Sequence, residues 1–121
     1  MDNGKRYSPV REKSFAFALR MVRLSRFLQD EKREFVLSKQ VLRSGTAIGA
    51  LVREAEQAES KADFIHKMAI ALKEANETEY WLDLLHQSEL IEDKSHQSLA
   101  PDLIELLKLL TSIIKSSKST H

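Results

Sequence analysis

The chain has no cysteine, and it contains little glycine, proline or aromatic residue. Without Cys, disulfides and thiolate chemistry are excluded, which fits a reducing compartment. Three Gly and two Pro in 121 residues are few for a sheet protein with many tight turns. No apolar run approaches the roughly 18 residues that a membrane span needs, and the N-terminal residues have no apolar signal core. We therefore expect a cytoplasmic protein with no membrane partner.

The residues that are abundant favour helices. Leu, Ala, Glu, Lys and Arg dominate the composition, and all are strong helix formers. Apolar residues make up 42% and charged residues 31%, a balance typical of a folded chain rather than a disordered one. A chain of this length has room for one hydrophobic core. We expect a single all-α domain over residues 1–121, with an ordered core at about 10–115 and flexible tails.

Apolar residues recur with helical spacing in four segments. These predict helices at about 10–29, 39–59, 61–88 and 99–115, with a polar connector at 89–98. Ser38 and Ser60 are the expected N-caps of the second and third helices. Pro101 is expected in the first turn of the fourth, where no N–H is needed. One short turn and two moderate connections predict an antiparallel, up-down-up-down four-helix bundle.

Three features of the pattern concern packing. Gly45 and Gly49 lie four residues apart on one helical face, although each costs roughly 1 kcal/mol of helix propensity relative to Ala. We interpret them as the place where a neighbouring helix approaches closely. Tyr80 and Trp81 are adjacent and point about 100° apart, so one is expected in the core and the other at its rim. The first helix is apolar on two sides, which predicts a second cover, such as another subunit.

Candidate catalytic and metal sites are weak. Three Asp-x-x-His pairs occur, but the first two lie 20 residues apart on one predicted helix, and their directions differ by about 200°. The third pair falls in the predicted polar connector. No Gly-rich phosphate loop, Gly-x-Ser-x-Gly elbow or Cys nucleophile is present. We predict no enzymatic activity, no metal, no cofactor and no small-molecule substrate. The pairs are Asp63/His66, Asp83/His86 and Asp93/His96.

Other polar residues of the central segment have structural interpretations. Ser44 and Thr46 have no neighbouring His to activate them, so they are expected to bond their own backbone or to pack at a helix crossing. The carboxylates at 74, 77 and 79 indicate a solvated or inter-subunit charged face. A helix-turn-helix over residues 39–56 is disfavoured, because the apolar register there is unbroken and no turn residue supports it.

The net charge of +1 conceals an asymmetry. Residues 1–43 hold 11 Lys and Arg against 5 acids, which gives +6, while residues 44–121 hold 8 against 13, which gives −5. A basic face can meet phosphates, or it can meet the acidic face of a neighbouring copy. Both alternatives stay open. The candidate nucleic-acid-binding residues are Arg11, Lys13, Arg20, Arg23, Arg26, Lys39 and Arg43.

The segments RSGTAIGALVREA (43–55) and SKADFIHKMAIALKEANETEYWLDLL (60–85) carry a family resemblance. They resemble small bacterial four-helix-bundle proteins encoded in intervening sequences of large-subunit ribosomal RNA genes. The accessory variability determinant of diversity-generating retroelements is related to that family. The resemblance covers residues 12–115, and Leu51 departs from it, since the family usually has Asn there. Matching positions are Arg43, Ser44, Ile48, Gly49, Glu54, Ala55, Ser60, Phe64, Ala71, Glu74, Glu77, Tyr80 and Trp81.

The resemblance implies a bundle that assembles as a ring, commonly a pentamer. It also implies that some members associate with nucleic acid through basic surface, without a catalytic site. We hypothesise a non-enzymatic homo-oligomer that binds structured RNA or a ribonucleoprotein with low sequence specificity. The first alternative is a protein–protein scaffold without nucleic acid, and the second is an accessory subunit of a reverse transcriptase.

Overall fold

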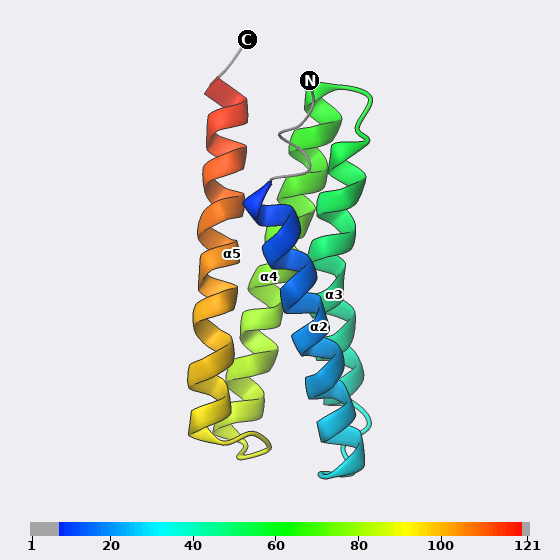
Figure 1. The fold of residues 1–121 in the computed structure, drawn as a ribbon, viewed down its shortest axis with the longest axis vertical. Helices are drawn as coiled ribbons and strands as arrows, with labels where there is room; N and C mark the ends of the chain where they lie inside the picture. The colour runs from blue at the N-terminus through cyan, green and yellow to red at the C-terminus, as the bar shows by residue number, and fades with distance from the viewer. Residues whose placement is uncertain (1–7, 120–121) are drawn as a thin grey trace.

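The computed structural model describes residues 8–119, which form four α-helices. They are α2 (Pro9–Asp30), α3 (Leu37–Glu56), α4 (Lys61–Gln87) and α5 (Asp93–Ser119). Figure 1 shows the helices running alternately down and up along one long axis. The predicted all-α, up-down-up-down bundle is confirmed. No helix in the described part of the chain is long and apolar enough to cross a membrane.

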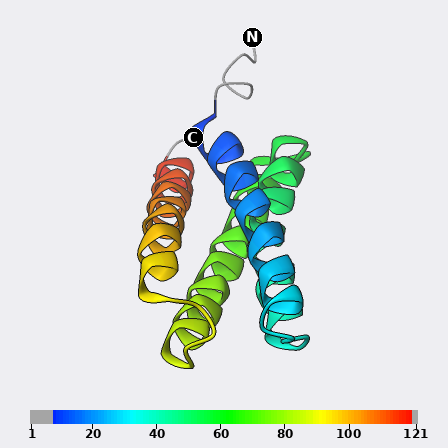
Figure 2. The ribbon, with the colours of Figure 1, turned by 60° about the horizontal axis from the view of Figure 1, so that its bottom comes forward.

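Successive helices pack on one another more closely than the first packs on the last. α2 contacts α3, α3 contacts α4 and α4 contacts α5 extensively, whereas α2 and α5 share far fewer contacts. Figures 1 and 2 show α2 and α5 side by side near the end of the bundle where α2 begins, and apart where α5 begins. The bundle is therefore open on one side between these two helices.

The core lies along the central axis and is built from the inward stripes of all four helices. Because these stripes follow the 3.6-residue period, each helix turns one face to the core and the other to solvent. α3 is one continuous helix, so the helix-turn-helix alternative is wrong. Fully buried side chains include Phe17, Met21, Leu28, Ile48, Leu82, Leu85, Leu103, Leu106 and Leu110.

The two central glycines lie where α3 meets α2. A Cβ on Gly45 would stand 2.3 Å from Cγ of Met21, and a Cβ on Gly49 would stand 3.3 Å from the carbonyl oxygen of Ser14. Carbon atoms normally stay about 3.5 Å or more apart. Close approach of a neighbouring helix is thus confirmed as the reason for both glycines.

The start of α3 differs from the prediction. Ser38 is not the N-cap but lies inside the helix, buried, with its Oγ accepting from Nε2 of Gln29 at 3.2 Å. The carboxylate of Glu34 caps the helix instead, accepting from the backbone N–H groups of Val36, Leu37 and Ser38 at 3.2, 3.0 and 2.8 Å. Burial opposes ionisation, but these three bonds outweigh it and lower the pKa of Glu34. α3 also ends at Glu56, three residues before its predicted end.

The start of α4 follows the prediction. Ser60 is the N-cap, and its Oγ accepts from the backbone N–H of Asp63 at 3.0 Å. Only the short segment 57–60 separates α3 from α4, so the two helices form an antiparallel hairpin. The tight turn folds α4 back along α3, so that Glu74 and Glu77 of α4 lie opposite Arg43 of α3.

α5 is much longer than predicted. It begins at Asp93, six residues before the expected start, and continues to Ser119. The polar segment 93–98 is therefore helix and not connector, and Pro101 lies in the helix interior instead of the first turn. Polar first turns give no apolar period, so the prediction placed the start too late. The flexible tails expected at the two ends fall partly on residues 1–7 and 120–121, which lie outside the described residues.

Candidate nucleic-acid interface

Four of the seven candidate cations form ion pairs within the chain. Exposed pairs of this kind stabilise a fold only slightly, by about 0–1 kcal/mol, but they neutralise the charge that would attract a phosphate. Nε of Arg11 lies close enough to Oε1 of Glu56 for an ion pair, but the two atoms are not aligned for a hydrogen bond. The pairs are Arg11–Glu56 (3.1 Å), Lys13–Glu105 (3.1 Å), Arg20–Asp102 (2.7 Å) and Arg43 with Glu74 and Glu77.

The other three candidate cations, the free cations, have no carboxylate partner among the residues that the structure describes. Arg23, Arg26 and Lys39 are exposed and form no ion pair with any residue between 8 and 119. Arg23 and Arg26 are three residues apart, so they neighbour each other on the surface of α2. Lys39 lies in the first turn of α3. Because α2 ends and α3 begins at the same end of the bundle (Figure 1), all three lie toward that end.

The segment that joins α2 to α3 adds two further cations and one aromatic ring, Phe35, and the end of α2 adds a second ring, Phe27. The charged groups of Lys32 and Arg33 lie 5.9 and 5.6 Å from the ring centroids of Phe27 and Phe35. Both rings are well exposed, at 40% and 45%. Sequence reasoning missed these four residues, although their alternation of basic and aromatic types was the available signal. The basic–aromatic end is defined as Arg23, Arg26, Phe27, Lys32, Arg33, Phe35 and Lys39.

Charge and chemistry at the basic–aromatic end suit a polyanion with exposed bases. Residues 23–39 contain five Lys and Arg against three carboxylates, which gives +2. One of the three, Glu34, is occupied by backbone N–H groups. Single-stranded segments of RNA are bound by cations that follow the phosphates and by aromatic rings that stack on unpaired bases.

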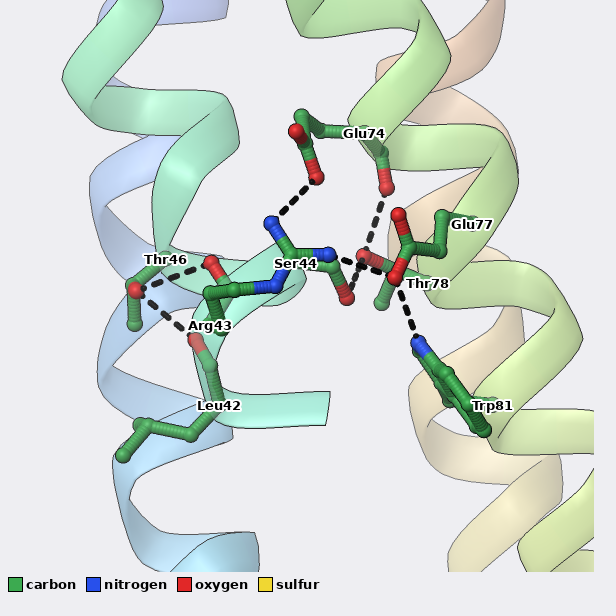
Figure 3. Close-up of polar contacts among 8 residues, drawn as sticks. All are labelled: Leu42, Arg43, Ser44, Thr46, Glu74, Glu77, Thr78 and Trp81. Atoms are coloured by element: carbon green, nitrogen blue, oxygen red, sulfur yellow. Dashed lines mark hydrogen bonds and ion pairs between the residues drawn. The ribbon is translucent and has the colours of Figure 1, made fainter. Parts of the chain in front are cut away.

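Arg43 belongs to a different structure, a polar network between α3 and α4 (Figure 3). Its guanidinium bonds Oε1 of Glu74 at 3.2 Å and Oε2 of Glu77. The same oxygen of Glu77 accepts from Nε1 of Trp81 at 2.9 Å. The hydrogen bond from Arg43 lowers the pKa of Glu77 most, and the hydrogen bond from Trp81 lowers it further. In return, the carboxylate of Glu77 raises the pKa of Arg43. This network occupies Arg43 with carboxylates, although Lys39 lies four residues before it on the same face of α3.

Beneath the network lies a buried polar contact that ties the same two helices together. The hydroxyls of Ser44 and Thr78 lie 2.9 Å apart, and both residues are fully buried. Thr46 donates to the carbonyl of Leu42 at 2.7 Å, so it bonds its own helix. The predicted structural roles of Ser44 and Thr46 are confirmed. Arg43, Ser44, Glu74, Glu77 and Trp81 also carry the family resemblance, which therefore reflects how α3 docks on α4.

The Tyr-Trp pair departs from its prediction. Trp81 is half-buried at the margin of the core, and Tyr80 is 60% exposed. The two rings meet edge to face, with centroids 5.0 Å apart. Neither ring is among the buried core residues, but Trp81 packs against the core from its margin, where its Nε1 donates to Oε2 of Glu77.

The second and third Asp-x-x-His pairs converge, because the third pair lies in α5 and not in the predicted polar connector. α5 begins early enough to place Asp93 and His96 beside Asp83 and His86 of α4. The imidazoles stack with centroids 4.2 Å apart. His86 contacts Asp93 at 2.6 Å, and His96 contacts Asp83 at 3.2 Å. The four side chains link α4 to α5. No group of three or more His, Cys, Asp or Glu within residues 8–119 is arranged to hold a metal ion.

The outer side of α2 is apolar and exposed. Phe15 is 51% exposed and Leu19 is 43% exposed, and they lie four residues apart on one face. A shallow groove beside Phe15 runs between α2 and α3 along Thr46 and Ala50. The predicted second apolar side of this helix therefore lies open to solvent in the single chain.

The fluorescence of Trp81 is expected to report the ionisation of Glu77, because Trp81 is the sole Trp of the chain. Glu77 should titrate below 4.5, its ordinary value. Its contribution to stability is complete above its unfolded pKa and is lost as the pH falls through the folded pKa. We expect Arg43→Met to move the midpoint of an acid fluorescence titration upward, toward 4.5.

Lys67→Met is the matched control, because Lys67 also pairs across α3 and α4, with Glu54 at 3.0 Å. It should leave the midpoint unchanged. Far-UV circular dichroism over the same pH range shows whether the helices remain folded. An unchanged midpoint in Arg43→Met, with the helices intact, would show that the network does not control Glu77.

Comparison with known proteins identifies a family and similar solved structures. The family model for the 23S rRNA-intervening sequence protein matches residues 7–112. A crystal structure of a protein with unknown function from the S23 ribosomal protein family of Bacteroides thetaiotaomicron is similar, with 60% sequence identity and a TM-score of 0.87. The similarity covers 88% of this chain and 98% of that one. No curated protein matches the chain.

Proposed function

The chain belongs to the 23S rRNA-intervening sequence protein family, and we propose that it acts without catalysis, as a homo-oligomer that binds structured RNA or a ribonucleoprotein with low sequence specificity. In this proposal Arg23, Arg26 and Lys39 contact phosphates. The proposal gives a structural role, ion pairing between helices, to the other four candidate cations, Arg11, Lys13, Arg20 and Arg43.

The observation that supports RNA binding is the division of the cations into two groups. Arg11, Lys13, Arg20 and Arg43 are matched with carboxylates of the same chain. The three free cations have no such match among the described residues, and they lie toward the end of the bundle that exposes Phe27 and Phe35. Phosphate contacts of this kind carry no sequence information, which accounts for low specificity.

Self-association is supported by the outer side of α2. Phe15 and Leu19 expose apolar surface on one face, and exposed apolar patches mark interaction sites. The proposed assembly is a ring, with five subunits as the family resemblance implies. Repetition of the basic–aromatic end around such a ring would multiply weak phosphate contacts, so that several subunits bind one RNA together.

The salt dependence of RNA binding tests the proposal. A structured RNA should bind with an affinity that falls linearly in a plot of log K against log salt, since each phosphate contact releases counterions. If three cations per subunit take part, the slope should be steeper than about −2 for each subunit engaged. Fluorescence anisotropy with a labelled hairpin RNA provides the measurement. Binding that is absent at low salt, or independent of salt, would contradict the proposal.

A second candidate function is a protein–protein scaffold without nucleic acid, which the exposed apolar face of α2 favours. On this account Phe15→Ser with Leu19→Ser should reduce the assembly to smaller species, and no RNA should bind to the wild-type chain. Ile104→Ser is the matched control, because Ile104 is 42% exposed on α5, away from that face. Light scattering distinguishes the oligomers, and the RNA titration separates the two functions.

A further inference from the structure

A cleft opens on the side of the bundle where α2 and α5 diverge. It has a volume of about 460 Å³ and lies between the second half of α2 and the first turns of α5. Figure 2 shows the two helices separating toward this end. Sites for small organic ligands typically occupy about 300–1,000 Å³, so the cleft has room for one such group. It is lined by three cations, two serines and four apolar side chains.

One wall of the cleft is a cation that is fixed in position. The guanidinium of Arg20 donates to the carbonyl oxygen of Ser98 at 3.0 Å, to its Oγ at 2.6 Å and to Oδ2 of Asp102 at 2.7 Å. These bonds join α2 to α5 and hold the cleft at its present width. Asp102 balances the charge of Arg20. Arg20 therefore shapes the cleft more than it attracts an anionic ligand.

Two other cations of the cleft have no such balance. Arg23 of α2 and Lys94 of α5 are exposed, line the cleft from opposite helices and form no ion pair in the part of the chain that the structure describes. Lys94 lies in the first turn of α5, where the helix dipole adds positive potential. The mouth of the cleft is therefore suited to an anion held from two sides.

The floor of the cleft is apolar and carries an exposed aromatic ring. Leu24, Ile91 and Leu99 are nearly buried, whereas Phe27 remains 40% exposed. A flat ring next to two free cations matches a ligand that joins a planar apolar body to an anionic group. Nucleotides have this combination, and unpaired bases of RNA stack on such rings.

We propose that this cleft holds one unpaired nucleotide, with its base against Phe27 and its phosphate between Arg23 and Lys94. The inference rests on the proposed RNA-binding function and refines it, because it identifies the part of an RNA that the protein prefers. A base within a duplex is stacked and paired, so it cannot enter the cleft. Loops and bulges of structured RNA present bases that can.

The test compares a hairpin RNA that has an unpaired loop with a blunt duplex of the same stem, using fluorescence anisotropy. The wild-type chain should bind the hairpin about tenfold more tightly than the duplex, the order of one stacking contact. Phe27→Ala should remove that preference while leaving duplex binding unchanged, which also shows that the variant is folded. Tyr80→Ala is the control, since Tyr80 is also an exposed ring but lies on α4, outside the cleft and outside the basic–aromatic end.

A third ligand, free adenosine monophosphate, distinguishes a nucleotide of RNA from a free nucleotide as the occupant. Calorimetry with the wild-type chain and Phe27→Ala provides this measurement. Binding that depends on Phe27 supports the cleft as a nucleotide site, even if neither RNA binds and the proposed RNA function fails. Equal binding of hairpin and duplex, unaffected by Phe27→Ala, overturns the cleft proposal while the RNA function stands. No binding of any of the three ligands overturns both.

Discussion

Replacing Arg23, Arg26 and Lys39 together with Gln is expected to weaken the binding of a structured RNA about 100-fold at about 0.15 M salt. Each of these cations has no carboxylate partner among the described residues, so its full charge is available to a phosphate. The slope of log K against log salt should also become shallower by about three for each subunit engaged, because about one unit is lost per phosphate contact. The loss should be similar for different RNA sequences.

The matched control is Lys73, Lys108 and Lys118, also replaced together with Gln. These three lysines are exposed on α4 and α5, outside the basic–aromatic end, and their replacement changes the net charge by the same amount. If binding depended only on overall charge, both triple variants would lose affinity equally. That result would remove Arg23, Arg26 and Lys39 as the RNA contacts. Arg20 is left out of the test because it bonds α2 to α5.

Gly45→Val is expected to lower the free energy of unfolding by about 2–3 kcal/mol, near the upper end of the usual cost of overpacking a core. The first atom added would stand 2.3 Å from Cγ of Met21, which is itself fully buried and cannot move aside without disturbing its neighbours. Relief of the glycine penalty offsets less than about 1 kcal/mol of this loss. Urea unfolding followed by circular dichroism gives the value.

A double-mutant cycle with Met21→Ala separates steric conflict from other effects. Met21→Ala removes Cγ and Sδ, the two atoms nearest to the added Cβ, and leaves space for the isopropyl group of Val. Gly45→Val should therefore cost much less in that background. Ala50→Val is the control, because Ala50 lies on the exposed side of the same helix and its replacement should change stability by less than about 0.5 kcal/mol. Equal losses at positions 45 and 50 would contradict the packing argument.

The parts of the fold that the sequence predicted depend on local periodicity. The four helices follow from apolar spacing, the Gly45–Gly49 pair from the cost of glycine in a helix, and the cap at Ser60 from the residue types at its start. The family was also identified correctly from the segment 43–85. Apart from the family segment, which spans α3 and α4, each of these signals lies within about one helical turn or within one helix, so it can be read without knowledge of neighbouring helices.

The parts that the sequence did not predict depend on how helices align along the bundle. The early start of α5 brings Asp93 and His96 beside Asp83 and His86, and no spacing within one segment indicates that offset. The cap of α3 is a local exception, because the carboxylate of Glu34 accepts from N–H groups two to four residues ahead, whereas the prediction placed the cap at Ser38.

The candidate site was only partly predictable for the same reason. Arg20 and Arg23 lie on one helix, three residues apart, and are equivalent in the sequence. Only the position of α5 shows that Arg20 meets Asp102, while Arg23 has no carboxylate partner among the described residues. Arg43 is likewise occupied because α4 places Glu74 and Glu77 opposite it. The charge asymmetry of the sequence therefore identified the basic region, but it did not show which of its Lys and Arg side chains are available to a ligand.

The mass of the protein in solution, measured by light scattering with and without a structured RNA, tests the central claim most directly. The account predicts an oligomer in the absence of RNA and a heavier complex in low salt that dissociates again as salt is raised. A monomer in the absence of RNA would remove the proposed self-association. An oligomer whose mass is the same with and without RNA at low salt would contradict RNA binding and leave the scaffold as the function.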